Sequence, residues 1–222
     1  MYNRLIKFLL KYKVINKYQF GFRKGHSTTL ALIKVMDEIY ENLDNNNHVM
    51  GIFLDLQKAF DTVSHSILLD KLYAYGVRGP AHKWIQNYLS NRSQYVTVNG
   101  GYSSNQYMEH GVPQGSILGP LLFLLFINDI VNVIPELKVK LFADDTNIFL
   151  FNKNLNLLFS EANKALDKLS TWFSVNKLSI NVDKTHYCIF RKSGQKLNCY
   201  TQYPELKLNN QIIERVQSTK YL

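Results

Sequence analysis

Two adjacent acids between two apolar runs constrain this chain more than any other feature of its sequence. Asp144 and Asp145 follow the largely apolar residues 139–143 and precede the apolar residues 148–151. Such runs on both sides of a short polar segment are typical of a β-hairpin. We therefore expect the two acids, with Thr146 and Asn147, to form its turn. Ionised neighbours repel each other, so the pair is compatible with a solvated turn or with a site where a cation or basic group faces the acids.

A second acid closes another apolar run. Residues 49–54 are almost all apolar and are followed directly by Asp55. This pattern is typical of a central strand that is covered on both faces. A carboxylate at the end of a buried strand needs a partner, which makes Asp55 a stronger ligand candidate than the acid pair alone. For Asp61, six residues later, the pattern favours capping of the local backbone over direct chemistry.

Helical spacing of apolar residues, capping residues and turn signals predict the remaining elements. We expect helices over residues 4–13, 29–43, 67–75, 82–89, 118–134 and 158–173, strands over 179–182 and 187–190, and hairpins over 94–109 and within 194–222. Ser27 or Thr28 would cap the second helix, and Trp84 and Tyr88 would lie in the core. Residues 111–116 are small or restricted, which favours either close approach of a ligand or an ordinary helix lead-in.

The N-terminal region is strongly basic. Lys and Arg outnumber Asp and Glu by 26 to 17, and residues 1–36 contain eight basic residues and no acid. Aromatic residues are interleaved with these charges, namely Tyr2, Phe8, Tyr12, Tyr18, Phe20 and Phe22. The combination is compatible with a surface for a polyanion such as nucleic acid. It is equally compatible with a basic amphipathic helix whose aromatic residues lie in the core.

Cysteine usage and hydropathy exclude several classes of protein. Cys188 and Cys199 have no CxxC spacing, which indicates neither a disulfide framework nor a zinc site and favours a reducing intracellular compartment. The longest apolar run, residues 117–127, is shorter than the roughly 20 residues that span a bilayer, so we expect a buried helix and no membrane partner. The basic, aromatic helix expected after Met1 has no evident cleavage site, so we expect no secretory signal.

The three acids could act together if their strands meet at one edge of a central sheet. Asp55, Asp144 and Asp145 would then suit hard divalent cations, because carboxylates tolerate proximity when metals neutralise them. Two such ions support phosphoryl transfer, with one activating the attacking hydroxyl and the other stabilising the leaving oxygen. The glycines at 21 and 25 predict a flexible loop around Arg23 and Lys24, which would hold a triphosphate.

Three segments in order carry a resemblance to a known family. They read GIFLDLQKAFDTV at 51–63, GVPQGSILGP at 111–120 and FADD at 142–145, and they resemble the A, B and C motifs of reverse transcriptases. Two further segments, QFGFR at 19–23 and NKLSINVDKT at 176–185, are similar to segments in the reverse transcriptases of non-LTR retrotransposons of the jockey or CR1 kind. The match covers nearly the whole chain.

The resemblance implies an α+β, right-hand polymerase with fingers and palm, the palm having a central antiparallel sheet backed by helices. The fingers would span about residues 1–48 and 66–108, and the palm about 49–65 and 109–192. Residues 193–222 would form a hairpin leading toward a thumb. From its length, we expect this chain to contain neither the thumb nor the N-terminal endonuclease that family proteins usually carry.

The resemblance also assigns roles to matched positions. Asp55, Asp144 and Asp145 would hold two Mg²⁺ ions, or Mn²⁺ in their place. Phe60 matches the steric gate, whose ring would crowd a ribose 2′-hydroxyl. Gln114 and Gly115 fall where the family contacts the incoming nucleotide and template, and Arg23 matches a residue near the triphosphate. Lys24 is a candidate for the triphosphate only through the charge of its loop. Lys184 matches a lysine that would protonate departing pyrophosphate, with a solvated turn lysine as the alternative.

The function implied is RNA-directed DNA synthesis, with an RNA template, a DNA primer and dNTPs as partners, at nuclear DNA. One alternative is a truncated element product that binds RNA through its basic residues and polymerises nothing. A second alternative, an RNA-templated RNA polymerase, is disfavoured by the ring at Phe60.

Overall fold

The computed structural model describes residues 1–192 and 203–219. The chain divides into two compact units, a helical unit (residues 1–15 and 58–128) and a sheet unit (residues 16–57 and 129–222). All three acids of the predicted site belong to the sheet unit. Phe60, Gln114 and Gly115 belong to the helical unit.

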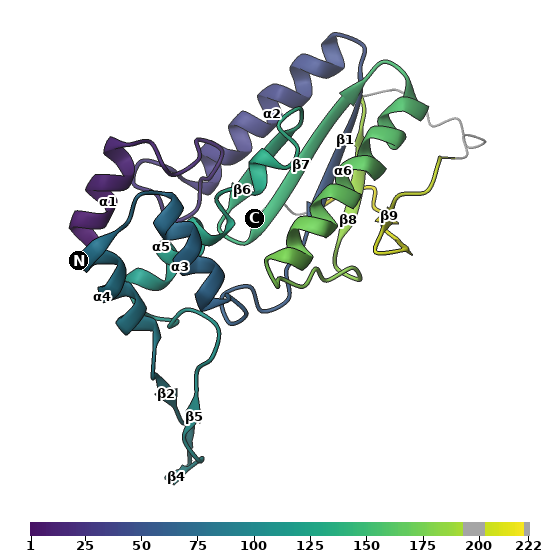
Figure 1. Ribbon diagram of the computed structural model, residues 1–222. Helices are drawn as coiled ribbons and strands as arrows, with labels where there is room; N and C mark the ends of the chain where they lie inside the picture. The colour runs from purple at the N-terminus through teal and green to yellow at the C-terminus, as the bar shows by residue number, and fades with distance from the viewer. Residues whose placement is uncertain (193–202, 220–222) are drawn as a thin grey trace. The chain divides into compact units, whose positions relative to one another are not determined.

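The sheet unit is organised around strand β1 (His48–Leu54), which lies in the middle of the sheet (Figure 1). Within the described residues the sheet has five strands in the order β11-β8-β1-β7-β6. Strands β8, β1, β7 and β6 pair antiparallel, and β11 pairs parallel with β8. The other strands are β6 (Lys138–Phe142), β7 (Asp145–Asn152), β8 (His186–Phe190) and β11 (Glu214–Arg215). Every residue of β1 after His48 is buried, which confirms the predicted central strand.

Helices α2 (Thr28–Asp44) and α6 (Leu155–Val175) cover opposite faces of this sheet (Figure 1). Residues Val35, Ile39 and Leu43 of α2 join one core cluster with Val49, Phe53, Phe149 and Cys188. Phe159 of α6 packs edge-on against Tyr187, with 5.9 Å between ring centroids. Tyr187 pairs with Ile52 of β1. Successive residues of a strand face opposite sides of the sheet, so Ile52 lies on the side opposite Phe53, which packs with α2. Helices therefore cover both faces of the sheet, as expected from the apolar run in β1.

Local signals placed the boundaries of α2 well. The Ser27 hydroxyl accepts a hydrogen bond from the Leu30 N–H at 3.1 Å, which confirms the predicted N-cap. The strand predicted over residues 179–182 is wrong, because this segment makes a single bridge between Leu56 and Ile180. At the C-terminal side, β9 (Lys207–Leu208) and β10 (Gln211–Ile212) form the expected hairpin. The rest of that prediction, residues 194–202 and 220–222, lies outside the described residues.

The helical unit packs around α5 (Leu118–Ile127), in which every residue except Pro120 is buried. The accompanying helices are α1 (Tyr2–Lys11), α3 (His65–Ala74) and α4 (Gly79–Leu89). The prediction that α5 continues to residue 134 is wrong. Asn128, a poor helix former, ends it and donates its side-chain amide to the Val14 carbonyl at 2.8 Å. None of the helices in the described ranges combines the length and apolarity needed to cross a bilayer.

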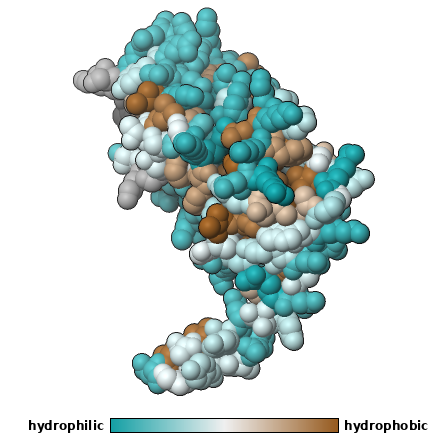
Figure 2. All heavy atoms as spheres, turned by 90° about the vertical axis from the view of Figure 1, so that its left-hand side faces the viewer, coloured by the Kyte–Doolittle hydropathy of each residue, from teal (hydrophilic) through white to brown (hydrophobic). Residues whose placement is uncertain are grey.

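The predicted hairpin over residues 94–109 is present as two short pairings and is exposed along its length. Strand β2 (Ser93–Gln94) pairs with β5 (Gln106–Tyr107), and β3 (Thr97–Val98) pairs with β4 (Gly101–Tyr102) across the expected turn at Asn99 and Gly100. Figure 2 shows hydrophobic residues, in brown, on this hairpin.

The prediction that Trp84 is a core residue is wrong. Trp84 is 41 % exposed, and its ring stacks on that of Tyr88 at a centroid distance of 5.5 Å. The buried positions of α4 are Ile85 and Leu89. Ile85 and Leu89 are four residues apart and form one stripe along the helix. Trp84 and Tyr88 have the same spacing and form a second stripe beside it.

Candidate active site

The acid pair lies where β6 turns into β7. Phe142 pairs with Asp145, so the turn consists of Ala143 and Asp144, with Ala143 in the left-handed region at φ 55°. The expectation that Thr146 and Asn147 belong to the turn is wrong. Both lie within β7 and are buried, because they pair with Leu141 and Lys140 in the interior of the hairpin.

Asp55 lies at the same end of the neighbouring strand. The last pair between β1 and β7 joins Leu54 to Thr146. Asp55 follows Leu54 and Asp145 precedes Thr146, so the two acids stand one residue beyond that pair. Antiparallel β1 and the β6–β7 hairpin therefore carry Asp55, Asp144 and Asp145 to one edge of the sheet.

The backbone of Asp55 is held by the segment that precedes β8. Its N–H donates to the Thr185 hydroxyl at 3.3 Å, and its carbonyl accepts from the Asn181 N–H at 2.9 Å. The Thr185 hydroxyl in turn donates to the Asn181 carbonyl at 2.8 Å. Thr185 is buried, so this arrangement fixes the chain direction directly beyond β1.

The three acids interact electrostatically. Burial raises the pKa of Asp144 above its ordinary value. A hydrogen bond from the Asp144 backbone lowers this pKa, and the negative charge of Asp55 raises it, so that the net shift is upward. Burial also raises the pKa of Asp145, and the charges of Asp144 and Asp55 raise it further. Partly desolvated carboxylates that repel one another are stabilised by a cation in front of them.

The donor set fits a hard divalent ion, although the ligands are not preassembled. Within residues 1–192 and 203–219, no group of three or more His, Cys, Asp and Glu side chains could hold a metal ion as it stands. Mg²⁺ is commonly bound through one or two carboxylates, with waters and substrate phosphates completing its coordination. Asp55, Asp144 and Asp145 supply such oxygens, so the three-carboxylate site stays a prediction.

The basic residues predicted for the triphosphate lie in a loop whose residues 18–20 are anchored to β6 by hydrogen bonds. Phe20 and Tyr18 exchange backbone hydrogen bonds with Leu141 of β6. Arg23 donates through Nη1 to the carbonyls of Asn16 and Gln19, both at 2.9 Å. Burial lowers the pKa of Arg23 below its ordinary value. Lys24 is exposed.

Lys184 is exposed and lies in the turn before β8. Its carbonyl accepts a hydrogen bond from the His186 ring at 2.9 Å. It is adjacent in sequence to Thr185, which contacts the Asp55 backbone. The Lys184 ammonium therefore projects from a segment that is anchored to the acid-bearing end of β1.

In the helical unit, Phe60 and the 111–116 loop lie together. The Phe60 carbonyl accepts from the Val112 N–H at 2.8 Å, and the Phe60 ring packs on Phe123 of α5 at a centroid distance of 4.4 Å. The Gln114 side chain donates to the Asp61 carboxylate at 2.7 Å. The prediction that Asp61 caps or orients the local backbone did not anticipate this contact with Gln114.

Glycines shape this loop. Gly111 has φ +87°, and a Cβ there would lie 2.8 Å from the Asp61 carbonyl oxygen, so the loop needs glycine for both space and conformation. Gly115 has φ +74° and open space around it, and Gln114 is exposed beside it. The loop therefore presents the exposed side chain of Gln114 and, at Gly115, backbone that no side chain covers.

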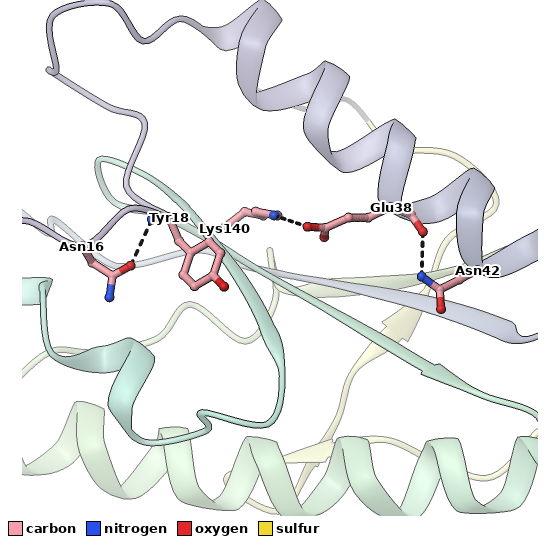
Figure 3. A network of polar contacts seen from close by, with 5 residues as sticks. All are labelled: Asn16, Tyr18, Glu38, Asn42 and Lys140. Atoms are coloured by element: carbon pink, nitrogen blue, oxygen red, sulfur yellow. Dashed lines mark hydrogen bonds and ion pairs between the residues drawn. The ribbon is translucent and has the colours of Figure 1, made fainter.

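An ion pair with a buried lysine and a partly exposed glutamate joins α2 to the acid-bearing hairpin (Figure 3). The Lys140 ammonium lies 2.6 Å from the Glu38 carboxylate, and the Lys140 side chain is 3 % exposed. The ammonium also lies 5.2 Å from the centre of the Tyr18 ring. Lys140 is in β6, close before the turn that carries Asp144.

A family model described as reverse transcriptase (RNA-dependent DNA polymerase) matches residues 1–222. The chain belongs to the reverse transcriptase family. This membership confirms the resemblance seen in the sequence. Members of this family generally use divalent metal ions.

Relatives of this reverse transcriptase chain come from non-LTR retrotransposons. It is 32 % identical over 228 residues to the RNA-directed DNA polymerase from mobile element jockey of Drosophila melanogaster, which covers 99 % of the chain and 24 % of that relative. It is 30 % identical over 218 residues to the jockey polymerase of Drosophila funebris, covering 95 % of the chain and 23 % of the relative. The chain therefore spans about a quarter of the length of these relatives.

Solved telomerase structures share the fold of this reverse transcriptase chain. Apo telomerase from Candida tropicalis, truncated from its C-terminal domain, aligns with a TM-score of 0.63 at 13 % identity, covering 86 % of the chain and 41 % of the telomerase chain. Telomerase of the same organism in complex with a TWJ fragment of telomeric RNA aligns with a TM-score of 0.65 at 13 % identity, covering 86 % and 33 %. This likeness shows the fold alone, a mixed helix and strand architecture with a central sheet.

Three polar residues of the reverse transcriptase chain were not identified as site residues from the sequence. Gln19 contacts the acid-bearing turn, Thr185 contacts the Asp55 backbone and Asp61 contacts Gln114. Each lies inside a motif segment that carried the resemblance, which was the only sequence signal for them. Their partners are distant in sequence, so spacing alone could not assign them.

Proposed function

We propose that this chain synthesises DNA on an RNA template from a primer, by phosphoryl transfer between the primer end and a dNTP. The observation that carries the proposal is the convergence of Asp55, Asp144 and Asp145 at one edge of the sheet in a reverse transcriptase chain. The names of the jockey relatives support the reaction.

In this proposal the three carboxylates hold two divalent ions, Mg²⁺ or Mn²⁺. The bound ions supply activation of the primer hydroxyl and stabilisation of the leaving oxygen. The protein's own task is to hold the acids in position, which Thr185 and the β6–β7 turn do by fixing the backbone on both strands. Lys184 donates a proton to the departing pyrophosphate.

Residues at the matched motif positions would select the nucleotide. Arg23 and Lys24 bind its triphosphate by charge, and Gln114 and Gly115 offer an amide and open backbone to the nucleotide and template. The Phe60 ring, held by Phe123, excludes a 2′-hydroxyl and so favours dNTPs over ribonucleotides. We assign fingers and palm to the segments that the family resemblance indicates, with β1, β6 and β7 in the palm.

Primer extension on an RNA template with Mg²⁺ tests the proposal. The chain should be assayed alone and joined to the flanking regions of its jockey relative, each with an Asp144→Asn variant. We expect extension that Asp144→Asn reduces by about 10³-fold or more, because removal of a metal ligand removes transition-state charge stabilisation. Extension that survives Asp144→Asn would contradict the metal assignment. RNA binding without extension in both forms would favour the alternative of an RNA-binding product.

A further inference from the structure

The Gln19 side chain is buried at the acid-bearing turn. It is 1 % exposed, and its amide oxygen accepts hydrogen bonds from the Ala143 N–H at 3.0 Å and from the Gly21 N–H at 2.8 Å. Its amide nitrogen lies 3.5 Å from the Ala143 carbonyl oxygen. A single side chain thus engages both backbone polar groups of the residue that precedes Asp144.

The backbone on either side of Gln19 is docked on the same strand. The Phe20 N–H donates to the Leu141 carbonyl at 2.8 Å, and the Leu141 N–H donates to the Tyr18 carbonyl at 2.9 Å. Gln19 therefore cannot shift along β6 without breaking this parallel bridge. Arg23 closes the other side of the segment by donating to the Gln19 carbonyl.

Gly21 shows how closely the segment approaches the turn. A Cβ at this position would lie 2.3 Å from the Ala143 nitrogen, which no real side chain can do. Ala143 itself has a left-handed φ of 55°, a conformation that residues with a side chain adopt only when their surroundings impose it. The contacts with Gln19 and Gly21 are such surroundings.

We propose that Gln19 is a positioning residue that fixes the Ala143–Asp144 turn and so presents the Asp144 carboxylate to the metal ions. The catalytic consequence rests on the proposed function, whereas the structural consequence does not. Without the Gln19 amide, Ala143 loses a hydrogen-bond partner for its N–H, and the turn gains freedom to leave its left-handed conformation. Outer partners of metal ligands act in this way, by orienting the ligand rather than touching the ion.

Hydrogen exchange tests whether Gln19 holds the Ala143–Asp144 turn, without any activity measurement. The variant is Gln19→Leu, which keeps a similar volume without the amide, and the matched control is Gln211→Leu at an exposed glutamine of the same unit. We expect the Ala143 amide to exchange about tenfold faster or more in Gln19→Leu, with Ile52 of β1 unchanged. Unchanged exchange at Ala143 would overturn the proposal, because Gln19 would then not hold the turn. Equal acceleration at Ile52 would also overturn it, because it would report general destabilisation.

A second variant guards against failure of Gln19→Leu to fold. Gly21→Ala keeps Gln19 but forces a Cβ against the Ala143 nitrogen, and Gly101→Ala is its control, because a Cβ there meets its nearest atom at an ordinary 3.4 Å. We expect faster exchange at Ala143 in Gly21→Ala only. Equal behaviour of the two glycine variants would contradict the close approach on which the proposal depends.

The role in metal binding is read from the Mg²⁺ dependence of primer extension. We expect Gln19→Leu to raise the Mg²⁺ concentration for half-maximal rate about tenfold with an unchanged KM for primer–template, and Gln19→Glu to restore part of it through its retained acceptor oxygen. An unchanged Mg²⁺ dependence, with faster exchange at Ala143, would overturn the positioning role. If the native chain extends no primer, the proposed function fails, and the exchange experiment still decides whether Gln19 holds the turn.

Discussion

Replacing Lys140 with methionine should destabilise the sheet unit markedly. Methionine keeps most of the apolar stem of lysine, so the loss comes from the charge rather than from packing. The substitution removes the ammonium that lies 2.6 Å from Glu38 and leaves that carboxylate without its counter-charge. The other carboxylate oxygen of Glu38, Oε2, is buried and has no hydrogen-bond partner among the described residues, so little else compensates the charge.

The magnitude follows from the burial of the two side chains. Removing one partner of a fully buried ion pair costs about 3–5 kcal/mol, whereas an exposed pair contributes about 0–1 kcal/mol. Lys140 is 3 % exposed but Glu38 is 26 % exposed, so water screens part of the remaining charge. We therefore expect Lys140→Met to lower the free energy of unfolding by about 2–3 kcal/mol. For a chain of this length that corresponds to a fall in Tm of about 4–12 °C.

Urea denaturation followed by circular dichroism measures this loss. The same measurement on Glu38→Gln and on the double variant gives the coupling energy, which we expect to be about 1–2 kcal/mol because the residues are in contact. Lys168→Met is the matched control: its ion pair with Glu136 spans 2.9 Å, but both side chains are more than half exposed. We expect it to change stability by about 0.5 kcal/mol or less. Equal effects of Lys140→Met and Lys168→Met, or strict additivity in the double variant, would refute the reasoning.

Three further predictions concern the site itself. Thr185→Val should lower the free energy of unfolding by about 0.5–1.5 kcal/mol in urea denaturation, because the part-buried N–H of Asp55 loses its side-chain acceptor. The Asn181 carbonyl loses the hydroxyl donor but keeps the Thr185 N–H, and an unchanged midpoint would contradict the prediction. Phe60→Val should raise ribonucleotide incorporation relative to dNTP incorporation by about tenfold or more in primer extension, and unchanged sugar selectivity would remove the gate. Lys184→Met should lower kcat about 10²-fold or more at unchanged KM if its ammonium is the proton donor, and a kcat within about twofold of native would identify a solvated turn lysine.

Local pattern predicted the elements that carry the acids. The apolar run before Asp55 specified a strand covered on both faces, and β1 is such a strand. The alternation of apolar runs around Asp144 specified a hairpin, and β6 and β7 form it. The predicted turn extended three residues too far, because Thr146 and Asn147 look like turn residues but are buried as cross-strand partners of Leu141 and Lys140.

The sequence by itself determined the family, the central strand, the acid-bearing hairpin and the capped helix α2, because these depend on periodicity and on motifs read from neighbouring residues. Only the tertiary structure decided which polar groups hold the site. Gln19 meets Ala143 across 124 residues, Thr185 meets Asp55 across 130, and Lys140 meets Glu38 across 102. Such pairings leave no periodic trace in a single sequence. They arise because polar groups that folding removes from water are stabilised by hydrogen bonds, and the folded chain supplies those partners from segments distant in sequence.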